Sequence, residues 1–174
     1  MNDFSALFFD SKGDFNFLKF KDFFELPGDM YDKVREKNIQ SKLLKIKNKN
    51  QRTLEEEQER NEGSRVKCVA LCIETKPDWG MLKEGNEMLR QGCTRVELGV
   101  QSVYDDVLKH VHRGHDSSDS KKSIQVLRDL GFKINFHYMP GLPLTDRDRD
   151  IAGMNQLFSD PAYKPDMIKM YPCM

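Results

Sequence analysis

The spacing of hydrophobic residues changes near residue 65 and divides the chain into two parts. Before that point the aromatic residues from Phe4 to Phe24 follow no steady period of 2 or 3.6. After it, short apolar runs alternate with segments in which apolar residues recur every three or four positions. The first pattern after residue 65 is typical of buried strands and the second of amphipathic helices. We therefore expect an irregular, partly helical segment over residues 1–64 and an α/β segment over 65–174.

The second part contains four expected strands alternating with helices. Its first run, VKCVALCIE over residues 66–74, is almost wholly apolar, as in a parallel strand buried on both faces. Strands that alternate with helices indicate βαβ units and a parallel sheet. The other strands are predicted at 94–100, 132–139 and 166–172, and the helices at 81–92, 103–110, 118–130 and 147–158.

The N-terminal part carries the signals of two helix starts. The turn LPGD at residues 26–29 precedes a helical pattern over 30–47, with Asp29 as the expected N-cap. Thr53 and Glu56 fit a capping box at the start of a second helix.

Charge is balanced over the whole chain but not within it. The 28 Lys and Arg residues equal the 28 Asp and Glu residues, whereas a protein that depends on phosphate contacts alone is usually basic. Residues 33–52 nevertheless carry eight basic residues and one acid, and residues 53–62 carry five Glu and one Arg. Such blocks form either solvated helix faces or a surface for nucleic acid or a partner. In the second case we expect RNA contacts from Lys42, Lys45, Lys47 and Lys49.

Several classes of protein and site are disfavoured. No run approaches 18 consecutive apolar residues, and the N-terminus has no basic leader, so we expect neither a membrane span nor a secretory signal. The four cysteines form no CxxC pair, which argues against a zinc site and favours reduced thiols that act as small hydrophobes. For His110, His112 and His115, surface or capping roles are favoured over metal binding. No metal ligands are predicted in this chain.

Polar residues gather where the expected strands end. In α/β sheets and barrels, ligands bind at the carboxyl ends of the strands. Glu74 and Glu97 can accept hydrogen bonds from ribose hydroxyls, Gln101 can donate and accept, and Arg113 can clamp a carboxylate.

Four segments resemble the radical S-adenosylmethionine domain of the Elongator catalytic subunit family, which modifies the wobble uridine of tRNA. They are CVALCIETKPDWG, RVELGVQSVYDDVLKHVHRGH, GFKINFHYMPGLP and DPAYKPDMIKMYP. The resemblance is strong over residues 53–174. It implies a partial (β/α) barrel of the radical-SAM type, with the N-terminal part as an irregular helical insertion.

The resemblance also implies a reaction and its site. A 4Fe–4S cluster would cleave S-adenosylmethionine to a 5′-deoxyadenosyl radical, which would take hydrogen from the acetyl methyl group of acetyl-CoA. The carbon radical formed on that methyl group would then add to C5 of the uridine. By motif, Gln101 and Arg113 would contact S-adenosylmethionine, and His137 stands where relatives often have Asp. Glu97 and Glu74 are weaker candidates for cofactor binding, and Lys169 and Tyr171 would face the substrate cavity. The catalytic residues themselves are not identified.

The sequence also differs from the family in two respects that bear on its activity. The three cysteines that hold the family's cluster have no counterpart here, and neither does its acetyltransferase domain. We therefore expect an interior segment of a larger enzyme that is inactive alone. Its partners would be tRNA, the rest of its own catalytic chain and, in a eukaryote, other Elongator subunits, in the cytoplasm or nucleus. Two alternatives remain open: a radical-SAM oxidase of the coproporphyrinogen type, and a non-catalytic barrel remnant that binds RNA or a partner.

Overall fold

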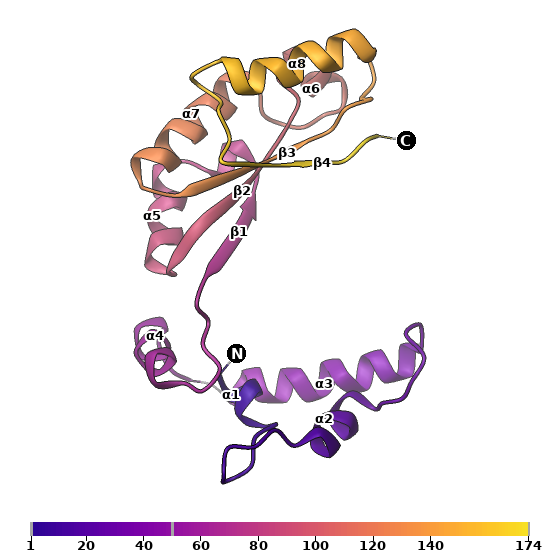
Figure 1. The fold of residues 1–174 in the computed structure, drawn as a ribbon, viewed down its shortest axis with the longest axis vertical. Helices are drawn as coiled ribbons and strands as arrows, with labels where there is room; N and C mark the ends of the chain where they lie inside the picture. The colour runs from indigo at the N-terminus through magenta and orange to yellow at the C-terminus, as the bar shows by residue number, and fades with distance from the viewer. Residues whose placement is uncertain (1, 50, 174) are drawn as a thin grey trace. The chain divides into compact units, whose positions relative to one another are not determined.

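The structure, a computed structural model, describes residues 2–49 and 51–173. The chain divides into two compact units, residues 1–69 and 70–174 (Figure 1). This division follows Val69, whereas the change in hydrophobic spacing pointed to residue 64. Among the described residues, no helix combines the length and the apolar character needed to cross a bilayer.

The first strand starts later than the sequence predicts, and Asn61 explains why. The Oδ1 atom of Asn61 accepts from the backbone N–H of Cys68 at 2.8 Å, and its Nδ2 donates to the carbonyl of Cys68 at 3.0 Å. These two backbone groups are thus occupied and are not available to a neighbouring strand. The predicted strand over 66–74 is correspondingly reduced to β1 (Leu71–Thr75), and Cys68 lies outside it.

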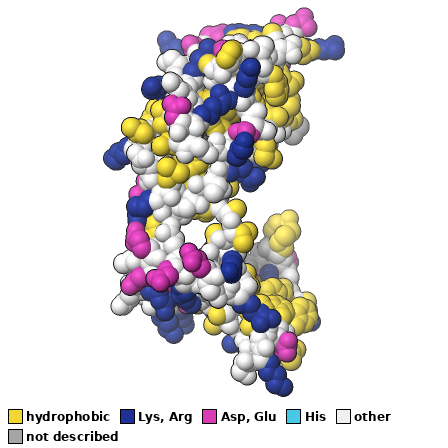
Figure 2. All heavy atoms as spheres, turned by 60° about the vertical axis from the view of Figure 1, so that its left-hand side comes forward, with side chains coloured by type: hydrophobic (Ala, Val, Ile, Leu, Met, Phe, Trp, Pro, Cys, Tyr) yellow, Lys and Arg dark blue, Asp and Glu magenta, His cyan; other side chains and the backbone are white. Residues whose placement is uncertain are grey.

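The first unit is helical and contains a cluster of aromatic rings. Phe8 lies 5.1 Å from Phe4, 5.3 Å from Phe20 and 5.5 Å from Phe23 between ring centroids, each in an edge-to-face arrangement. Phe8 is the only buried hydrophobic residue in the described part of this unit. Hydrophobic side chains also lie open on the surface shown in Figure 2. The helices are α1 (Asn2–Ala6), α2 (Phe17–Phe24), α3 (Lys33–Lys49) and α4 (Leu54–Gly63).

The helix starts of this unit were predicted with mixed success. The capping box of Thr53 and Glu56 is present at the start of α4. Asp29, the expected cap of α3, instead accepts from the N–H of Tyr31 within the preceding turn. The first free N–H groups of α3 donate to Asp32 Oδ1, from Val34 at 2.8 Å, so Asp32 is the capping residue.

The second unit is an α/β layer with a parallel sheet, as predicted. Its strands follow the order β1-β2-β3-β4, and every neighbouring pair is parallel. Consecutive strands are therefore neighbours, as in a (β/α) barrel, and α5, α7 and α8 lie on one side of the sheet (Figure 1). The remaining elements are β2 (Cys93–Gln101), β3 (Lys133–Tyr138), β4 (Met167–Met170), η1 (Pro77–Trp79), α5 (Leu82–Arg90), α6 (Asp105–His110), α7 (Ser117–Asp129) and α8 (Arg147–Ser159).

The two faces of the sheet differ in character. On the helix side, Val96, Leu98, Ile134 and Phe136 are at most 1% exposed and form the core with residues of α7. Tyr138 is also buried, and desolvation raises the pKa of its hydroxyl to about 12. The alternate positions of β2 and β3 carry polar residues instead, so the sheet presents one apolar and one polar face.

Candidate functional site

Polar residues from all four strands form a row across one face of the sheet. The register pairs Glu74 with Glu97, Glu97 with Asn135, and His137 with Lys169. Because side chains alternate between the two faces of a strand, residues spaced in this way share a face. The row lies on the face away from the helices, towards the carboxyl ends of the strands.

Glu97 is the centre of this row. Its Oε2 lies 2.8 Å from His137 Nε2 and also accepts from the ammonium of Lys169, while Arg95 Nη2 lies 3.7 Å from Oε1. The side chain is only 8% exposed. Hydrogen bonds from Lys169 and His137 lower the pKa of Glu97 to about 2, and the bond with Glu97 raises the pKa of Lys169. The charged carboxylate of Glu97 is thus already engaged within the protein.

His137 lies between two carboxylates. Its Nε2 faces Glu97, and its Nδ1 lies 3.4 Å from Glu74 Oε1. The imidazole side chain is 7% exposed, whereas the side chain of Glu74 is 67% exposed. Tyr171, which follows β4, places its ring edge-to-face with His137 at 5.4 Å. Glu74, Lys169 and Tyr171 are therefore exposed to solvent, whereas Glu97 and His137 are buried.

Gln101 closes β2 in an uncommon backbone conformation. Its φ is 64°, in the left-handed region that favours glycine, and the register with β3 shifts between Leu98 and Gln101. The side-chain Oε1 is buried and has no hydrogen-bond partner. A strained residue with an unpaired buried acceptor is typical of a binding position.

Arg113 reaches the same position from the loop after α6. Its Nη2 donates to the carbonyl of Gly99 at 3.4 Å, and its Nε is buried without a partner. A Cβ on Gly99 would lie 3.1 Å from Arg113 Nη2 and 3.2 Å from Gln101 Nε2. The absent side chain at Gly99 thus leaves room for both polar groups over the strand.

A second group of polar residues, which lies close to Arg113, was not identified from the sequence. Lys76 Nζ donates to Asp78 Oδ2 at 3.0 Å and to the carbonyl of Arg113 at 3.5 Å, and so joins the loop after β1 to the loop that carries Arg113. His115, which we expected at the surface, is 6% exposed, and burial lowers its pKa. Asp78 Oδ1 and His115 Nδ1 have no partner. The sequence signal that could have indicated this group was Lys76, which directly follows β1.

The row also contains a group with metal-ligand geometry. Single ligand atoms of Glu74, Glu97 and His137 lie within 4.8 Å of one another. The ammonium of Lys169, however, binds the same Oε2 of Glu97 that faces the imidazole. The positive charge of Lys169 already lies beside the Glu97 carboxylate. The group formed by Glu74, Glu97 and His137 therefore favours a hydrogen-bonding organic ligand over a cation.

The cysteines do not fit an iron–sulfur cluster. All four are free, and Cys93 alone is buried, while Cys72 and Cys173 are exposed, which contradicts the expectation of four small hydrophobes. Within the described residues, the row of Glu74, Glu97 and His137 is the only set of three grouped metal-binding side chains. A cluster bound by cysteines therefore has no ligand set here.

The four lysines predicted to contact RNA fall into two kinds. Lys42 Nζ donates to the carbonyl of Phe23 and to Glu25 Oε1, both at 2.9 Å, and lowers the pKa of Glu25. It therefore caps the carboxyl end of α2, where a positive charge is favourable. The others, Lys45, Lys47 and Lys49, are exposed along the last turns of α3.

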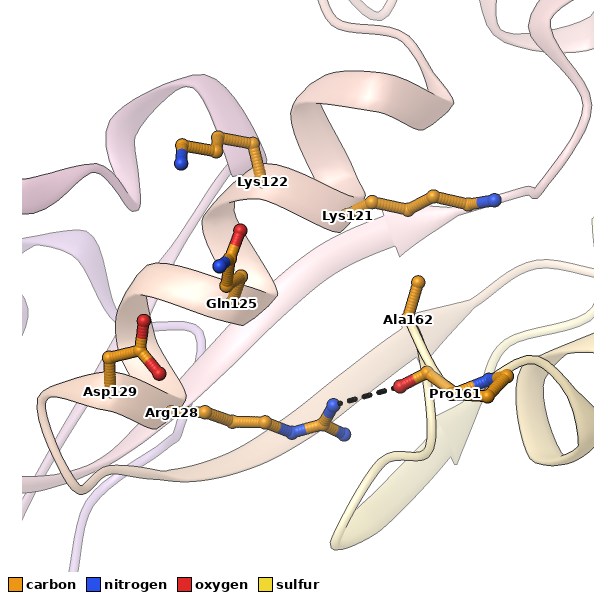
Figure 3. Close-up of a pocket in the computed structure, with 7 residues that line it drawn as sticks. All are labelled: Lys121, Lys122, Gln125, Arg128, Asp129, Pro161 and Ala162. Carbon is orange, nitrogen blue, oxygen red and sulfur yellow. Dashed lines mark hydrogen bonds between the residues drawn. The ribbon is translucent and has the colours of Figure 1, made fainter.

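A surface groove lies apart from the predicted residues. It has a volume of about 380 Å³ and runs between α7 and the segment after α8, with Lys121, Lys122 and Arg128 along it (Figure 3). Arg128 points across the groove and donates to the carbonyl of Pro161 at 3.4 Å. None of the candidate residues of the sheet lines it.

Comparison with protein families gives one clear match. The model of the radical SAM superfamily matches residues 34–154. The tRNA uridine(34) acetyltransferase of Methanocaldococcus jannaschii is 48% identical over 122 residues, which are 70% of this chain and 23% of that protein. Human Elongator complex protein 3 is 43% identical over 114 residues, 66% of this chain and 21% of that protein. The chain thus spans about a quarter of the length of these relatives.

Solved structures agree on the fold. The archaeal Elp3 of Methanocaldococcus infernus, with an N-terminal deletion, matches with a TM-score of 0.70 and 47% identity over 72% of this chain and 29% of that one. Coproporphyrinogen III oxidase (HemN) from Escherichia coli, a radical SAM enzyme, matches with a TM-score of 0.54 over 81% of this chain and 28% of that one. Its identity is 20%, so this second match supports the fold alone.

Proposed function

Because this chain belongs to the radical SAM superfamily, we propose that its parallel sheet is the S-adenosylmethionine-binding part of an enzyme that modifies the wobble uridine of tRNA. The observation that carries the proposal is the set of unpaired polar atoms at the carboxyl ends of the strands. The similarity to tRNA uridine(34) acetyltransferases supports the substrate. The full reaction would be acetyl-CoA-dependent carboxymethylation at C5 of uridine.

The residues of the polar face fit S-adenosylmethionine. Gln101 Oε1 and Arg113 Nε are buried without partners, and the missing side chain of Gly99 leaves space beside them. Gln101 would accept from the cofactor, and Arg113 would donate to its carboxylate or adenine. The exposed carboxylate of Glu74, with His137, would bind the ribose hydroxyls, and Glu97 would act on His137.

The cofactor supplies the hydrogen-abstracting group of radical SAM chemistry when bound. The protein's own part is to hold the nucleoside in a fixed orientation against the polar face and to keep water from it. Lys169 and Tyr171, at the end of the last strand, would line the substrate side of the cavity. Because the cysteines do not fit a cluster, we propose that this chain alone does not cleave S-adenosylmethionine.

The RNA would also contact the first unit. The exposed Lys45, Lys47 and Lys49 on α3 are suited to phosphate contacts, which need mobile, solvent-exposed cations. Lys42 is excluded from this set because it caps α2. We further propose that the remainder of a longer catalytic chain and, in a eukaryote, other Elongator subunits complete the assembly in the cytoplasm or nucleus.

Anaerobic iron–sulfur reconstitution of this chain tests the proposal. Cluster absorbance and 5′-deoxyadenosine formation from S-adenosylmethionine would be followed together, with a full-length archaeal relative as the positive control. We expect neither signal from this chain, together with saturable binding of S-adenosylmethionine. A cluster with turnover would show that Cys68, Cys72, Cys93 or Cys173 ligates iron. Absence of cofactor binding would favour a non-catalytic barrel that binds RNA or a partner.

A further inference from the structure

A cavity of about 610 Å³ opens where the strands of the sheet begin, and the proposed function does not use it. The register pairs Arg95, which lines the cavity, with Cys72 on one side and Lys133 on the other. Arg95 precedes Gln101 by six positions on β2, roughly 20 Å at the rise of a strand. The Arg95 cavity is thus separate from the strand ends that carry Gln101. The residues that line it include Leu71, Cys72, Arg95, Lys133, Asp166 and Met167.

The guanidinium of Arg95 has only weak acceptors in this cavity. Its Nε donates to Cys72 Sγ at 3.3 Å and its Nη1 to Met167 Sδ at 4.0 Å. Thiol and thioether sulfurs are weak hydrogen-bond acceptors. Its Nη2 lies 3.7 Å from Glu97 Oε1, which is too far for a hydrogen bond. The Arg95 side chain is 43% exposed, so its N–H groups are open to a stronger acceptor from outside the chain.

The acids near the cavity have partners of their own. Asp166 accepts from Lys133 Nζ at 3.0 Å through Oδ1 and from the N–H of Ile134 at 2.9 Å through Oδ2, so both of its oxygens are engaged. The carboxylate of Glu97 is bound by a lysine and a histidine, as described above. The charge of Arg95 is therefore the one that these acids leave unbalanced, and the cavity favours an anion.

We propose that the Arg95 cavity binds a small organic carboxylate with an apolar body. The planar fork of a guanidinium matches the two oxygens of a carboxylate, and a single unbalanced cation suits one negative charge better than a phosphate dianion. Leu71 and Met167 on the walls would cover the apolar body. The volume lies within the range of roughly 300–1,000 Å³ that is usual for small-molecule sites. This site is independent of the proposed cofactor site.

Titration of this chain with hexanoate, followed by NMR, tests the site. The Nε–H of Arg95 and the methyl group of Met167 are the reporters, and Arg95→Lys and Met167→Leu assign their signals. We expect saturable shifts of both with hexanoate and none with hexanamide, which has the same apolar body without the charge. Arg95→Gln should weaken hexanoate binding about tenfold, because it removes a charge-assisted pair. Arg147→Gln, at an exposed arginine of α8, is the matched control and should bind as the wild type does.

Alkylation of Cys72 by iodoacetamide provides the second readout. Cys72 is exposed and lines the cavity beside Arg95, whereas Cys173 is exposed and does not line it. Saturating hexanoate should slow the modification of Cys72 several-fold and leave that of Cys173 unchanged, as measured on the two peptides of one sample by mass spectrometry.

Three results would each overturn the inference: no saturable shift with hexanoate, equal shifts with hexanamide, or an equal affinity for inorganic phosphate. Unchanged affinity in Arg95→Gln would do the same, because it would separate binding from the guanidinium. The comparison of hexanoate with hexanamide uses the wild-type chain, so it decides the question even if Arg95→Gln does not fold.

Discussion

The two units of this chain use their hydrophobic residues in different ways. In the second unit, alternation along β2 and β3 sends apolar side chains to a closed core under the helices and polar side chains to the opposite face. In the first unit, aromatic rings pack edge-to-face, yet Phe15 and Phe17 remain 51% and 55% exposed. Many aromatic residues alone do not make a core. The strict two-residue period of a strand places apolar side chains on one face of the sheet and polar side chains on the other.

The polar residues differ between the units in the same way. In the first unit, Lys42 and Arg35 of α3 donate to backbone carbonyls at the end of α2 and serve the fold. In the second unit, Gln101 and Arg113 keep buried polar atoms unpaired at the strand ends. Unpaired buried groups cost stability and are retained where a ligand completes them.

The largest expected difference concerns core truncation. Phe136→Ala removes a fully buried ring of β3 and should lower the free energy of unfolding by about 3–5 kcal/mol. Phe17→Ala, on the exposed side of α2, should change it by no more than about 0.5 kcal/mol. Urea denaturation of both variants checks this contrast. Equal losses would show that the first unit has a core of its own around Phe17.

The next largest expected effect is a loss of stability at acid pH, caused by protonation of Glu97. Its pKa is lowered to about 2 in the folded chain from 4.5, so its contribution to stability is present above pH 4.5 and is lost as the pH falls towards 2. We expect Glu97→Gln to remove a pH-dependent contribution on the order of 2–3 kcal/mol from the unfolding free energy measured between pH 5 and 2.

Glu87 provides the matched control for this acid effect. Hydrogen bonds from Arg90 and Gln91 also lower its pKa to about 2, but it lies exposed at the surface of α5. Solvent screens such a surface pair, so Glu87→Gln should leave the acid profile nearly unchanged. Identical profiles for Glu97→Gln and the wild type would contradict the role of Glu97 as the centre of the row.

Two glycine substitutions, one in each unit, test the same contrast with smaller expected effects. Gly99→Ala places a methyl group 3.1 Å from Arg113 Nη2 and should weaken binding of S-adenosylhomocysteine about tenfold, as one lost hydrogen bond would. Gly63→Ala, in α4 with open space around it, should instead stabilise the first unit by about 0.5–1 kcal/mol. Calorimetric titration and thermal unfolding measure the two effects. Unchanged affinity in Gly99→Ala would contradict the role of the space above Gly99 in binding.

The smallest expected effect concerns the salt dependence of RNA binding. Charge reversal of Lys45, Lys47 and Lys49 should lower the slope of log K against log salt by about 0.7–0.9 for each lost phosphate contact. Lys42→Met should leave the slope nearly unchanged and lower the stability of the first unit, because it removes the cap of α2. Filter binding of tRNA over a salt series separates the two. A slope unaffected by the triple reversal would make this block a solvated helix face.

Period and turn residues were sufficient to predict most of the fold. The predicted strand over 132–139 corresponds to β3 (Lys133–Tyr138), and the predicted helix over 118–130 to α7 (Ser117–Asp129). The start of β1 was wrong because a side chain from α4, Asn61, binds Cys68. Such a tertiary bond leaves no trace in local hydrophobicity.

The candidate site was predictable as a list of residues but not as a network. Gln101 and Arg113 could be placed from motifs, and the structure adds their unpaired atoms. The bond of Glu97 with Lys169 depends on the register of β2, β3 and β4, which no local pattern specifies. The burial of His115 was missed for the same reason, since the loop after α6 folds back under the strand ends.

Titration of this chain with S-adenosylmethionine, followed by NMR, tests the central claim that the polar face of the sheet binds the cofactor. We predict saturable shifts at the side-chain amide of Gln101 and the ring of His137, and loss of binding in Gln101→Ala and Arg113→Ala. Lys122→Ala, in the groove beside α7, should bind as the wild type does. Shifts confined to the α7 groove, or affinity unchanged in both site variants, would contradict the assignment of the polar face.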